Sequence, residues 1–278
     1  MLADVVAQME TLYDPAWAES WDAVGLVCGD PAQDVRRILF AVDPVAVVVD
    51  EALEYGADLI VTHHPLYLRG TTSVAATTFK GRVIHRLIRN DVALYTAHTN
   101  ADVADPGVSD ALARAVGLSG ELRPLRPAVD DPRRGLGRIG TLPSPMTLRA
   151  FAERAASGLP GTAGPLRVAG DPDRPVVTVA VSGGAGDSLL GTARASGADV
   201  FLTADLRHHP ASEFMEAEGG PALIDASHWA TEWPWLADAA ERLTSALAAK
   251  GINVEARVSR IVTDAWTSTT PYSPPRAP

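Results

Sequence analysis

The sequence predicts an α/β protein with two lobes, in which strands alternate with helices. Short apolar runs rich in β-branched residues, such as residues 59–61, are typical of buried strands. Between them lie stretches whose apolar residues recur every three or four positions, which predicts helices. Strand–helix–strand units favour sheets that are mainly parallel or mixed, flanked by helices. A chain of 278 residues is long enough to form two such lobes.

The first lobe is predicted over residues 1–125. Its loop at 14–34 has no clear periodicity, and loops of that length in compact domains are often functional. Pro44 favours the first turn of the second helix. The expected helices span 3–12, 44–55, 79–90 and 107–116, and the expected strands span 36–43, 57–62 and 92–97.

The second lobe is predicted over residues 126–262, after a Pro-, Arg- and Asp-rich connector at 118–135. Its segment 225–262 is expected to return to a site in the cleft between the lobes. Residues 263–278 contain four prolines and are expected to form an irregular tail. The expected strands span 136–142, 165–169, 175–182, 198–204, 221–226 and 252–258, and the helices span 147–157, 187–196, 211–218 and 231–250.

Charge and composition exclude several classes of function. The net charge of −10 and the pI near 5.1 argue against a general affinity for nucleic acid. They leave room only for a local basic patch, formed by Arg123, Arg126, Arg133 and Arg134. No apolar run approaches the ~20 residues of a membrane span, so no membrane association is expected.

Cysteine usage and the N-terminus predict a cytoplasmic protein. Cys28 is the single cysteine, which excludes an intrachain disulfide and a cysteine-rich metal site. We expect its side chain to be a small buried hydrophobe. No signal-peptide pattern is visible. His85 lies on a basic amphipathic helix and is expected to be solvated.

The other six histidines mark the expected site, because each follows an apolar run predicted as a strand. They are His63, His64, His98, His208, His209 and His228. The carboxyl ends of parallel strands are where α/β folds place their sites. Pro65 ends the regular strand, which allows the adjacent imidazoles of His63 and His64 to turn toward one point.

Two carboxylates accompany these histidines at a spacing of four. Asp102 follows His98, and Glu232 follows His228. Imidazole and carboxylate are the usual ligands for zinc, iron, manganese, cobalt or nickel. Residues four apart share one face of a helix. Since Pro234 favours the first turn of a helix, we expect His228 to precede that helix and the pair to converge through a loop-to-helix turn.

Other interpretations of these residues stay open at this point. His63 and His64 could be a satisfied structural pair at a strand end, and His98 alone is more typical of a supporting residue than of a ligand. His208 and His209 could line a cavity or cap a helix as readily as bind metal. The glycine-rich stretch at 182–187 matches no nucleotide-binding motif, which favours a tight turn.

Six motifs make the chain resemble the NIF-three-like family, whose members are called GTP cyclohydrolase type-2 homologues. The motifs appear in family order and span most of residues 1–262. They are SWDAVGLVCGDP (20–31), ADLIVTHHPL (57–66), AHTNAD (97–102), SGGAGD (182–187), TADLRHH (203–209) and SHWATEWP (227–234).

The resemblance implies a NIF-three-like fold with a dinuclear metal centre, assembled as a toroidal hexamer that is a trimer of dimers. Two divalent ions per chain are expected, with Glu232 as the bridging carboxylate. The implied ligands are His63, His64, Asp102, His228 and Glu232. Some relatives carry a domain inserted midway, for which the connector at 118–135 leaves no room.

These expectations lead to two functional hypotheses. The first is a metal-dependent hydrolase that acts on a nucleotide, phosphoester or cyclic amide through a metal-bound hydroxide. His98 would then orient a ligand or water, while His208, His209 and Asp205 would line the cavity as substrate contacts or proton carriers. The alternative is a non-catalytic metal-binding, metal-delivery or scaffold protein, because fold and metal do not fix the reaction.

Overall fold

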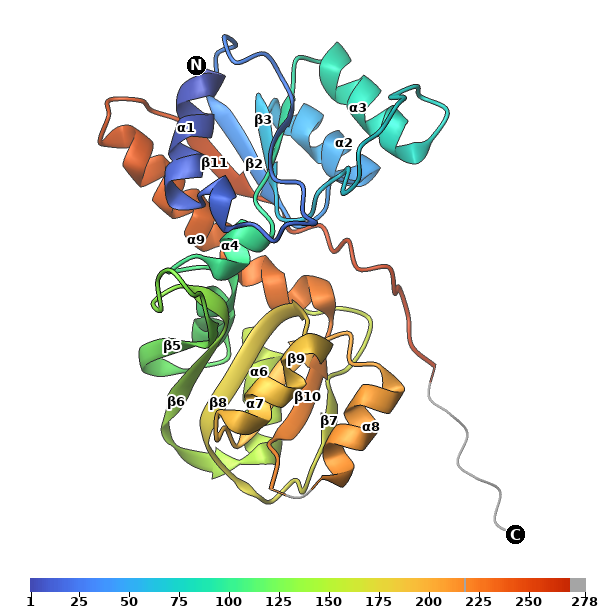
Figure 1. Ribbon diagram of the computed structural model, residues 1–278. Helices are drawn as coiled ribbons and strands as arrows, with labels where there is room; N and C mark the ends of the chain where they lie inside the picture. Colours follow the sequence, from blue (N-terminus) through green and yellow to red (C-terminus); the bar gives the residue numbers. More distant parts are fainter. Residues whose placement is uncertain (218, 271–278) are drawn as a thin grey trace.

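A computed structural model describes residues 1–217 and 219–270, and it contains two sheets flanked by helices (Figure 1). The first sheet has the strand order β1-β4-β3-β2-β11, and the second has the order β5-β6-β8-β9-β10-β7. Each sheet forms the centre of one lobe, and α9 runs from one lobe to the other. The predicted α/β fold class is confirmed.

The first sheet is parallel except at one edge. Its strands are β1 (Gly25–Cys28), β2 (Arg37–Ala41), β3 (Leu59–Thr62), β4 (Ala93–Thr96) and β11 (Glu255–Val258). β1 pairs antiparallel with β4, and the other neighbours pair in parallel. The helices α1 (Leu2–Leu12) and α9 (His228–Ala248) cover one face, and α2 (Ala46–Tyr55) and α3 (Phe79–Arg89) cover the other.

Side chains alternate between the two faces along each strand, so neighbouring residues pack against different helices. Ile38 and Phe40 of β2 pack in the cluster with α1 and α9, whereas Leu39 and Ala41 pack in the cluster with α2 and α3. Both faces are apolar, as expected for a parallel strand buried on both sides. His85 projects from α3 into solvent, in agreement with the sequence.

The expectation of an irregular loop at 14–34 is wrong in part, because β1 lies within it. β1 is short, and its pairing with β4 shifts register between Leu26 and Cys28. That irregularity interrupts the period-two pattern by which a strand is recognised. Cys28 is half-buried in β1, and burial raises the pKa of its thiol to about 11.

The second sheet is mixed, within the predicted range of mainly parallel or mixed sheets. Only β8, β9 and β10 pair in parallel, and the remaining pairs are antiparallel. Its strands are β5 (Ser119–Pro127), β6 (Gly135–Thr147), β7 (Arg167–Ala169), β8 (Pro175–Ala185), β9 (Val200–Ala204) and β10 (Ala222–Ala226). Its helices are α5 (Val108–Ala115), α6 (Leu148–Gly158), α7 (Leu190–Ala195) and α8 (His208–Glu216).

The stretch predicted as a connector contains the edge strand β5. Pro124 and Pro127 lie in this strand, which pairs with β6 on one side only. Proline lacks a backbone donor and is tolerated at a sheet edge, where no second neighbour needs that donor. Composition alone therefore suggested a linker where the chain forms a strand.

The helix α9 begins at His228, three residues before the start that Pro234 suggested. Pro234 lies inside the helix, where proline normally costs about 3 kcal/mol. Buried side chains on both sides of it, including Trp229 and Trp235, hold the helix against its neighbours. Tertiary packing thus outweighs the local preference.

Residues 259–270 follow β11 without a helix or strand. The rest of the predicted tail, 271–278, lies outside the described residues. Among the helices of residues 1–217 and 219–270, none has the length and apolar character needed to cross a bilayer.

One buried ion pair fastens α5 to the second sheet. Arg138 of β6 is 1% exposed, and its Nε donates to Asp110 Oδ1 of α5 at 2.9 Å. Its other donors reach the carbonyl oxygens of Gly135, Gly137 and Ala104 at 2.5–2.8 Å. Removal of such a partner leaves a buried carboxylate unpaired and strongly destabilises the folded protein.

We predict that Arg138→Leu lowers the free energy of unfolding by about 3–5 kcal/mol, because Asp110 is left buried without its partner. Urea denaturation followed by circular dichroism measures the change. The control is Arg133→Leu, which removes an exposed pair with Asp131 and should change stability by less than about 1 kcal/mol. Equal, small losses in both variants would contradict the structural role of Arg138.

Candidate metal centre

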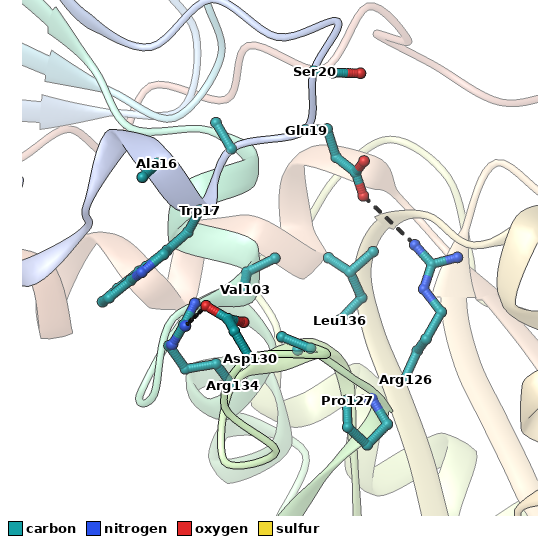
Figure 2. A pocket seen from close by; sticks show the side chains of 13 residues that line it. Ala16, Trp17, Glu19, Ser20, Val103, Arg126, Pro127, Asp130, Arg134 and Leu136 are labelled. Carbon is teal, nitrogen blue, oxygen red and sulfur yellow. Dashed lines mark hydrogen bonds and ion pairs between the residues drawn. The ribbon is translucent and has the colours of Figure 1, made fainter.

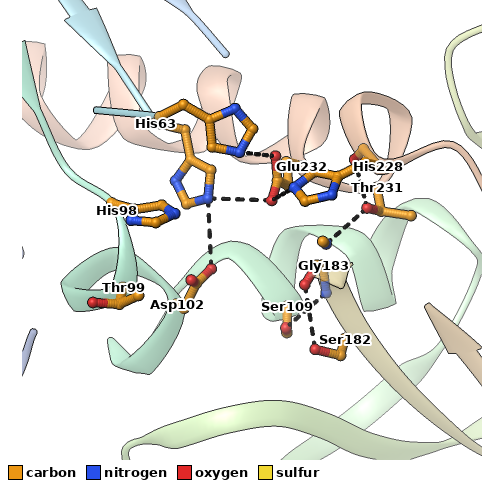
Figure 3. Close-up of polar contacts among 12 residues, drawn as sticks. His63, His98, Thr99, Asp102, Ser109, Ser182, Gly183, His228, Thr231 and Glu232 are labelled. Carbon is orange, nitrogen blue, oxygen red and sulfur yellow. Dashed lines mark hydrogen bonds and ion pairs between the residues drawn. The ribbon is translucent and has the colours of Figure 1, made fainter. Parts of the chain in front are cut away.

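Four imidazole rings meet where β3 and β4 end and α9 begins (Figure 3). His63 and His64 follow β3, and His98 follows β4 as the residue before the short helix α4 (Thr99–Val103). His228 is the first residue of α9. The ring centroids of His63 lie 5.2 Å from His64 and 5.1 Å from His98, and His64 lies 5.1 Å from His228.

The carboxylate of Glu232 lies among these rings and is buried. Its Oε1 is 3.0 Å from His228 Nε2 and 3.4 Å from His63 Nε2, and its Oε2 is 3.1 Å from His64 Nε2. Asp102 of α4 approaches from the other side, with Oδ1 3.7 Å from His63 Nε2. The structure therefore brings together all five residues named as ligands from the sequence.

The spacing of His228 and Glu232 works differently from the expected loop-to-helix turn. Because α9 begins at His228, the two residues lie one turn apart on the same helix face. Their side chains reach one point directly.

Each of the four imidazoles is held through its Nδ1 atom by an acceptor from another part of the chain. The pairs are His63 with the carbonyl oxygen of Ala97 (3.0 Å), His64 with Asp43 (2.7 Å), His98 with Asp22 (2.8 Å) and His228 with Asp205 (2.7 Å). Carbonyl and carboxylate oxygens only accept, so Nδ1 carries the proton and each Nε2 faces inward. Metal-ligating histidines are oriented by this kind of partner.

Two of these partners, Asp22 and Asp43, were missed from the sequence. Asp43 follows β2 near its carboxyl end, which is the same signal that identified His63 and His64. Asp22 lies in the long loop that was expected to be functional. Asp205 was expected in the cavity, and it instead holds His228 from a left-handed backbone position with φ of 55°.

Two buried atoms at the centre show what the cluster is suited to bind. His63 Nε2 and Glu232 Oε2 are both buried without a hydrogen-bond partner among the described residues. Buried polar atoms are normally satisfied, and a cation at this point would engage both. Two groups could hold an ion, with ligand atoms within 4.8 Å of one another: His63, His64 and His98, and His64, His228 and Glu232.

Electrostatics show how strongly the groups interact. Burial would raise the pKa of Glu232, but the imidazoles of His64, His63 and His228 hold it well below its usual range. Burial would lower the pKa of His228, but the charge of Glu232 raises it to about 9. The pKa of Asp102 is raised, chiefly by burial. A divalent cation would compete with protons for these imidazoles.

A cavity of about 490 Å³ opens onto the cluster. His98, Asp102, His228 and Glu232 line one wall, and Gly183 and Gly184 of β8 line another. Gly184 has a φ of 65°, and a Cβ there would lie 2.6 Å from Glu232 Oε1. The tight turn expected at 182–187 is corrected, because residues 182–185 are the end of strand β8. The glycines there leave the cluster accessible from the cavity.

His208 and His209 lie elsewhere. Both are exposed in the first turn of α8, with their ring centroids 5.1 Å apart. His208 lines a separate pocket with Arg167 and Asp225, and neither histidine lines the cavity described above. The expected placement in that cavity is corrected, because α8 begins at His208 and the two side chains belong to that helix.

The segment after β11 braces the cluster from outside. Thr263 Oγ1 donates to Asp43, the residue that holds His64. Ser227, immediately before His228, donates to Asp264 at 2.5 Å. Ser259 anchors this segment, because its backbone N–H donates to the carbonyl oxygen of Phe40 in β2 at 2.8 Å.

The chain is similar over nearly its whole length to known proteins. The model of the family described as Duf34/NIF3 (NGG1p interacting factor 3) matches residues 1–265. A Streptomyces coelicolor protein named GTP cyclohydrolase 1 type 2 homolog is 59% identical, over 96% of this chain and 94% of that protein. A crystal structure of a Bacillus cereus protein related to NIF3 has a TM-score of 0.88 and 26% identity, over 96% of this chain and 99% of that one.

A longer relative differs in size. A Mycobacterium tuberculosis protein, also named GTP cyclohydrolase 1 type 2 homolog, is 38% identical, over 95% of this chain and 96% of that protein. That alignment runs over 370 positions, more than the 278 residues here, so the relative carries additional residues. The short β5–β6 region of the present chain agrees with the absence of an inserted domain there.

We predict that the metal-free protein loses stability as the pH rises from about 6.5 to about 9. The folded state raises the pKa of His228 to about 9, so its stabilising contribution is complete below the ordinary pKa of 6.5 and is lost through about pH 9. Urea unfolding of chelator-treated protein across this range measures the slope. His228→Gln should reduce the slope without abolishing it, because the pKa values of His63 and His64 are raised as well. His85→Gln, at an exposed position, should leave the slope unchanged, and a flat wild-type profile would contradict the coupling.

Proposed function

Because the chain belongs to the Duf34/NIF3 family, we propose that its cluster binds two divalent metal ions and that the protein is a metal-dependent hydrolase. The proposed ligands are His63, His64, Asp102, His228 and Glu232. The substrate class is a nucleotide, phosphoester or cyclic amide. The name GTP cyclohydrolase 1 type 2 homolog, carried by the relatives, agrees with this range.

The observation that carries the proposal is the position of Glu232. Its two oxygens face different imidazoles, Oε1 toward His63 and His228 and Oε2 toward His64. A carboxylate in this position can bridge two cations. Three neutral imidazoles and two carboxylates suit two divalent ions better than one, and they leave coordination positions open on the cavity side.

The chemistry follows from this arrangement. Divalent ions polarise a phosphoryl or carbonyl oxygen and lower the pKa of bound water toward neutrality. His98, with Nδ1 fixed by Asp22, presents its Nε2 beside the cavity and can orient the substrate or hold a proton there. Gly183 and Gly184 leave room for the reacting group. The identity of the metals depends on availability as much as on the ligands.

We predict that Glu232→Gln loses at least about half of the bound metal and lowers hydrolysis by at least about 100-fold, because it removes the bridging charge at unchanged size. Mass spectrometry measures the metal, and a panel of nucleotides, phosphoesters and cyclic amides measures hydrolysis. Glu241→Gln, at an exposed position of the same helix, is the matched control and should match wild type.

The outcomes separate the hydrolase from its alternative. Hydrolysis that survives unchanged in Glu232→Gln would refute the catalytic role of the cluster. Metal binding that depends on Glu232, without hydrolysis of any compound in the panel, would favour a metal-binding or metal-delivery protein. Metal content far below two ions per chain after repletion, unaltered by His63→Gln, would refute the dinuclear site.

We also propose a cytoplasmic location and a toroidal hexamer, on the grounds of the single cysteine and of the family resemblance. The expected mass in solution is six times the 29.2 kDa of one chain. Light scattering coupled to size-exclusion chromatography measures it. A monomer at micromolar concentration would contradict the hexamer without affecting the proposed metal site.

A further inference from the structure

We propose that Arg126 forms an anion subsite beside the metal cluster and that Trp21 supplies a stacking surface at the same cavity. The substrate class would then be a phosphorylated compound with a planar ring, such as a nucleoside monophosphate. This inference rests on the proposed function in one respect, namely that the reacting bond lies at the cluster.

The first observation is the charge of the cavity wall. Glu19, Asp102 and Glu232 line the cavity, and Arg126 is the one lysine or arginine among its described lining residues. Its side chain is 47% exposed. Within residues 1–217 and 219–270 its single polar partner is Glu19, with Nη2 and Oε1 3.6 Å apart, which is too far for a hydrogen bond.

Two arginines near Arg126 in the sequence, Arg134 and Arg138, have close polar partners, in contrast to Arg126. Arg138 is buried against Asp110 and three carbonyl oxygens. Arg134 pairs with Asp130 at 2.7 Å and stacks over the ring of Trp17 at 4.3 Å. The guanidinium of Arg126 has all its donors available, and a planar guanidinium binds phosphate through paired hydrogen bonds.

The second observation is that Arg126 lines two hollows, one of which is drawn in Figure 2. A pocket of about 420 Å³ shares Glu19, Arg126 and Leu136 with the cavity at the cluster. Figure 2 shows the Glu19–Arg126 pair, and both of its residues line both hollows. Such a long, half-exposed ion pair is weak, so a phosphate can replace the carboxylate of Glu19. A ligand with one end at the cluster can therefore extend past Arg126.

The third observation is Trp21, which lines the same cavity with 55% of its surface exposed. Its ring meets His98 edge to face, with the centroids 6.0 Å apart. An exposed large aromatic side chain at a cavity rim is well suited to stack on a planar ring of a ligand. The guanidinium of Arg126, the ring of Trp21 and the cluster around Glu232 together match a phosphorylated heterocycle better than a simple phosphoester or an uncharged cyclic amide.

Calorimetric binding to the metal-loaded full-length protein tests the inference without requiring turnover. The probes are AMP and GMP, each compared with its nucleoside. The variant is Arg126→Gln. The matched control is Arg123→Gln, an exposed residue three positions earlier on β5, which therefore faces the other side of the strand. Circular dichroism confirms that both variants are folded.

We expect Arg126→Gln to weaken binding of the monophosphates by about tenfold and to leave nucleoside binding unchanged. Arg123→Gln should bind both kinds of ligand as wild type does. Trp21→Ala should weaken nucleosides and monophosphates alike. These results would stand even if no hydrolysis were found, so they test the subsite separately from the proposed hydrolase.

Three results would overturn the inference. Monophosphates could bind Arg126→Gln as tightly as wild type, which would mean that the phosphate contacts the cluster alone. Equal weakening by Arg123→Gln would reveal a general charge effect. Absence of monophosphate binding to the wild-type protein would exclude the substrate class.

Discussion

The burial of one negative charge, that of Glu232, constrains much of this structure. A carboxylate taken out of water must be matched by close opposite charge or by hydrogen bonds. Three imidazoles supply that match, two from the end of β3 and one from the same helix. The parallel neighbours β3 and β4 bring His63 and His98 together at the carboxyl ends of these strands, and α9 carries Glu232 to the same place.

The four imidazoles of the cluster are themselves held in place by hydrogen bonds. Every imidazole of the cluster has its outer nitrogen held by an oxygen from a different segment, which leaves all inner nitrogens facing the centre. The inner face stays open because Gly184 has no side chain. Imidazoles that are fixed through their outer nitrogens, with an open cavity on the inner side, are what a site needs to hold an ion and still admit a ligand.

Sequence patterns predicted the parts of the fold that depend on local signals. The apolar run of β3, ending in His63 and His64, was identified with its site because strand ends and polar residues coincide there. Asp22 was missed because a single acidic residue in a loop resembles any solvated one until its partner is known. The start of α9 was misplaced because the packing of Trp229 and Trp235 outweighs the preference of Pro234 for the first turn of a helix. Pairing partners across the chain, as for β1 and β5, are not encoded in any short window.

The contributions of β11 and the bracing segment set an order in time. β11 completes one edge of the first sheet beside β2, and Thr263 and Asp264 reach residues that adjoin the histidines. A ribosome releases His63 and His64 long before Glu232 and Thr263. The nascent first lobe therefore lacks an edge strand, a covering helix and the central carboxylate, so the complete cluster can form only once Glu232 has emerged. An ion that needed Glu232 as a ligand would therefore bind only after most of the chain had been made.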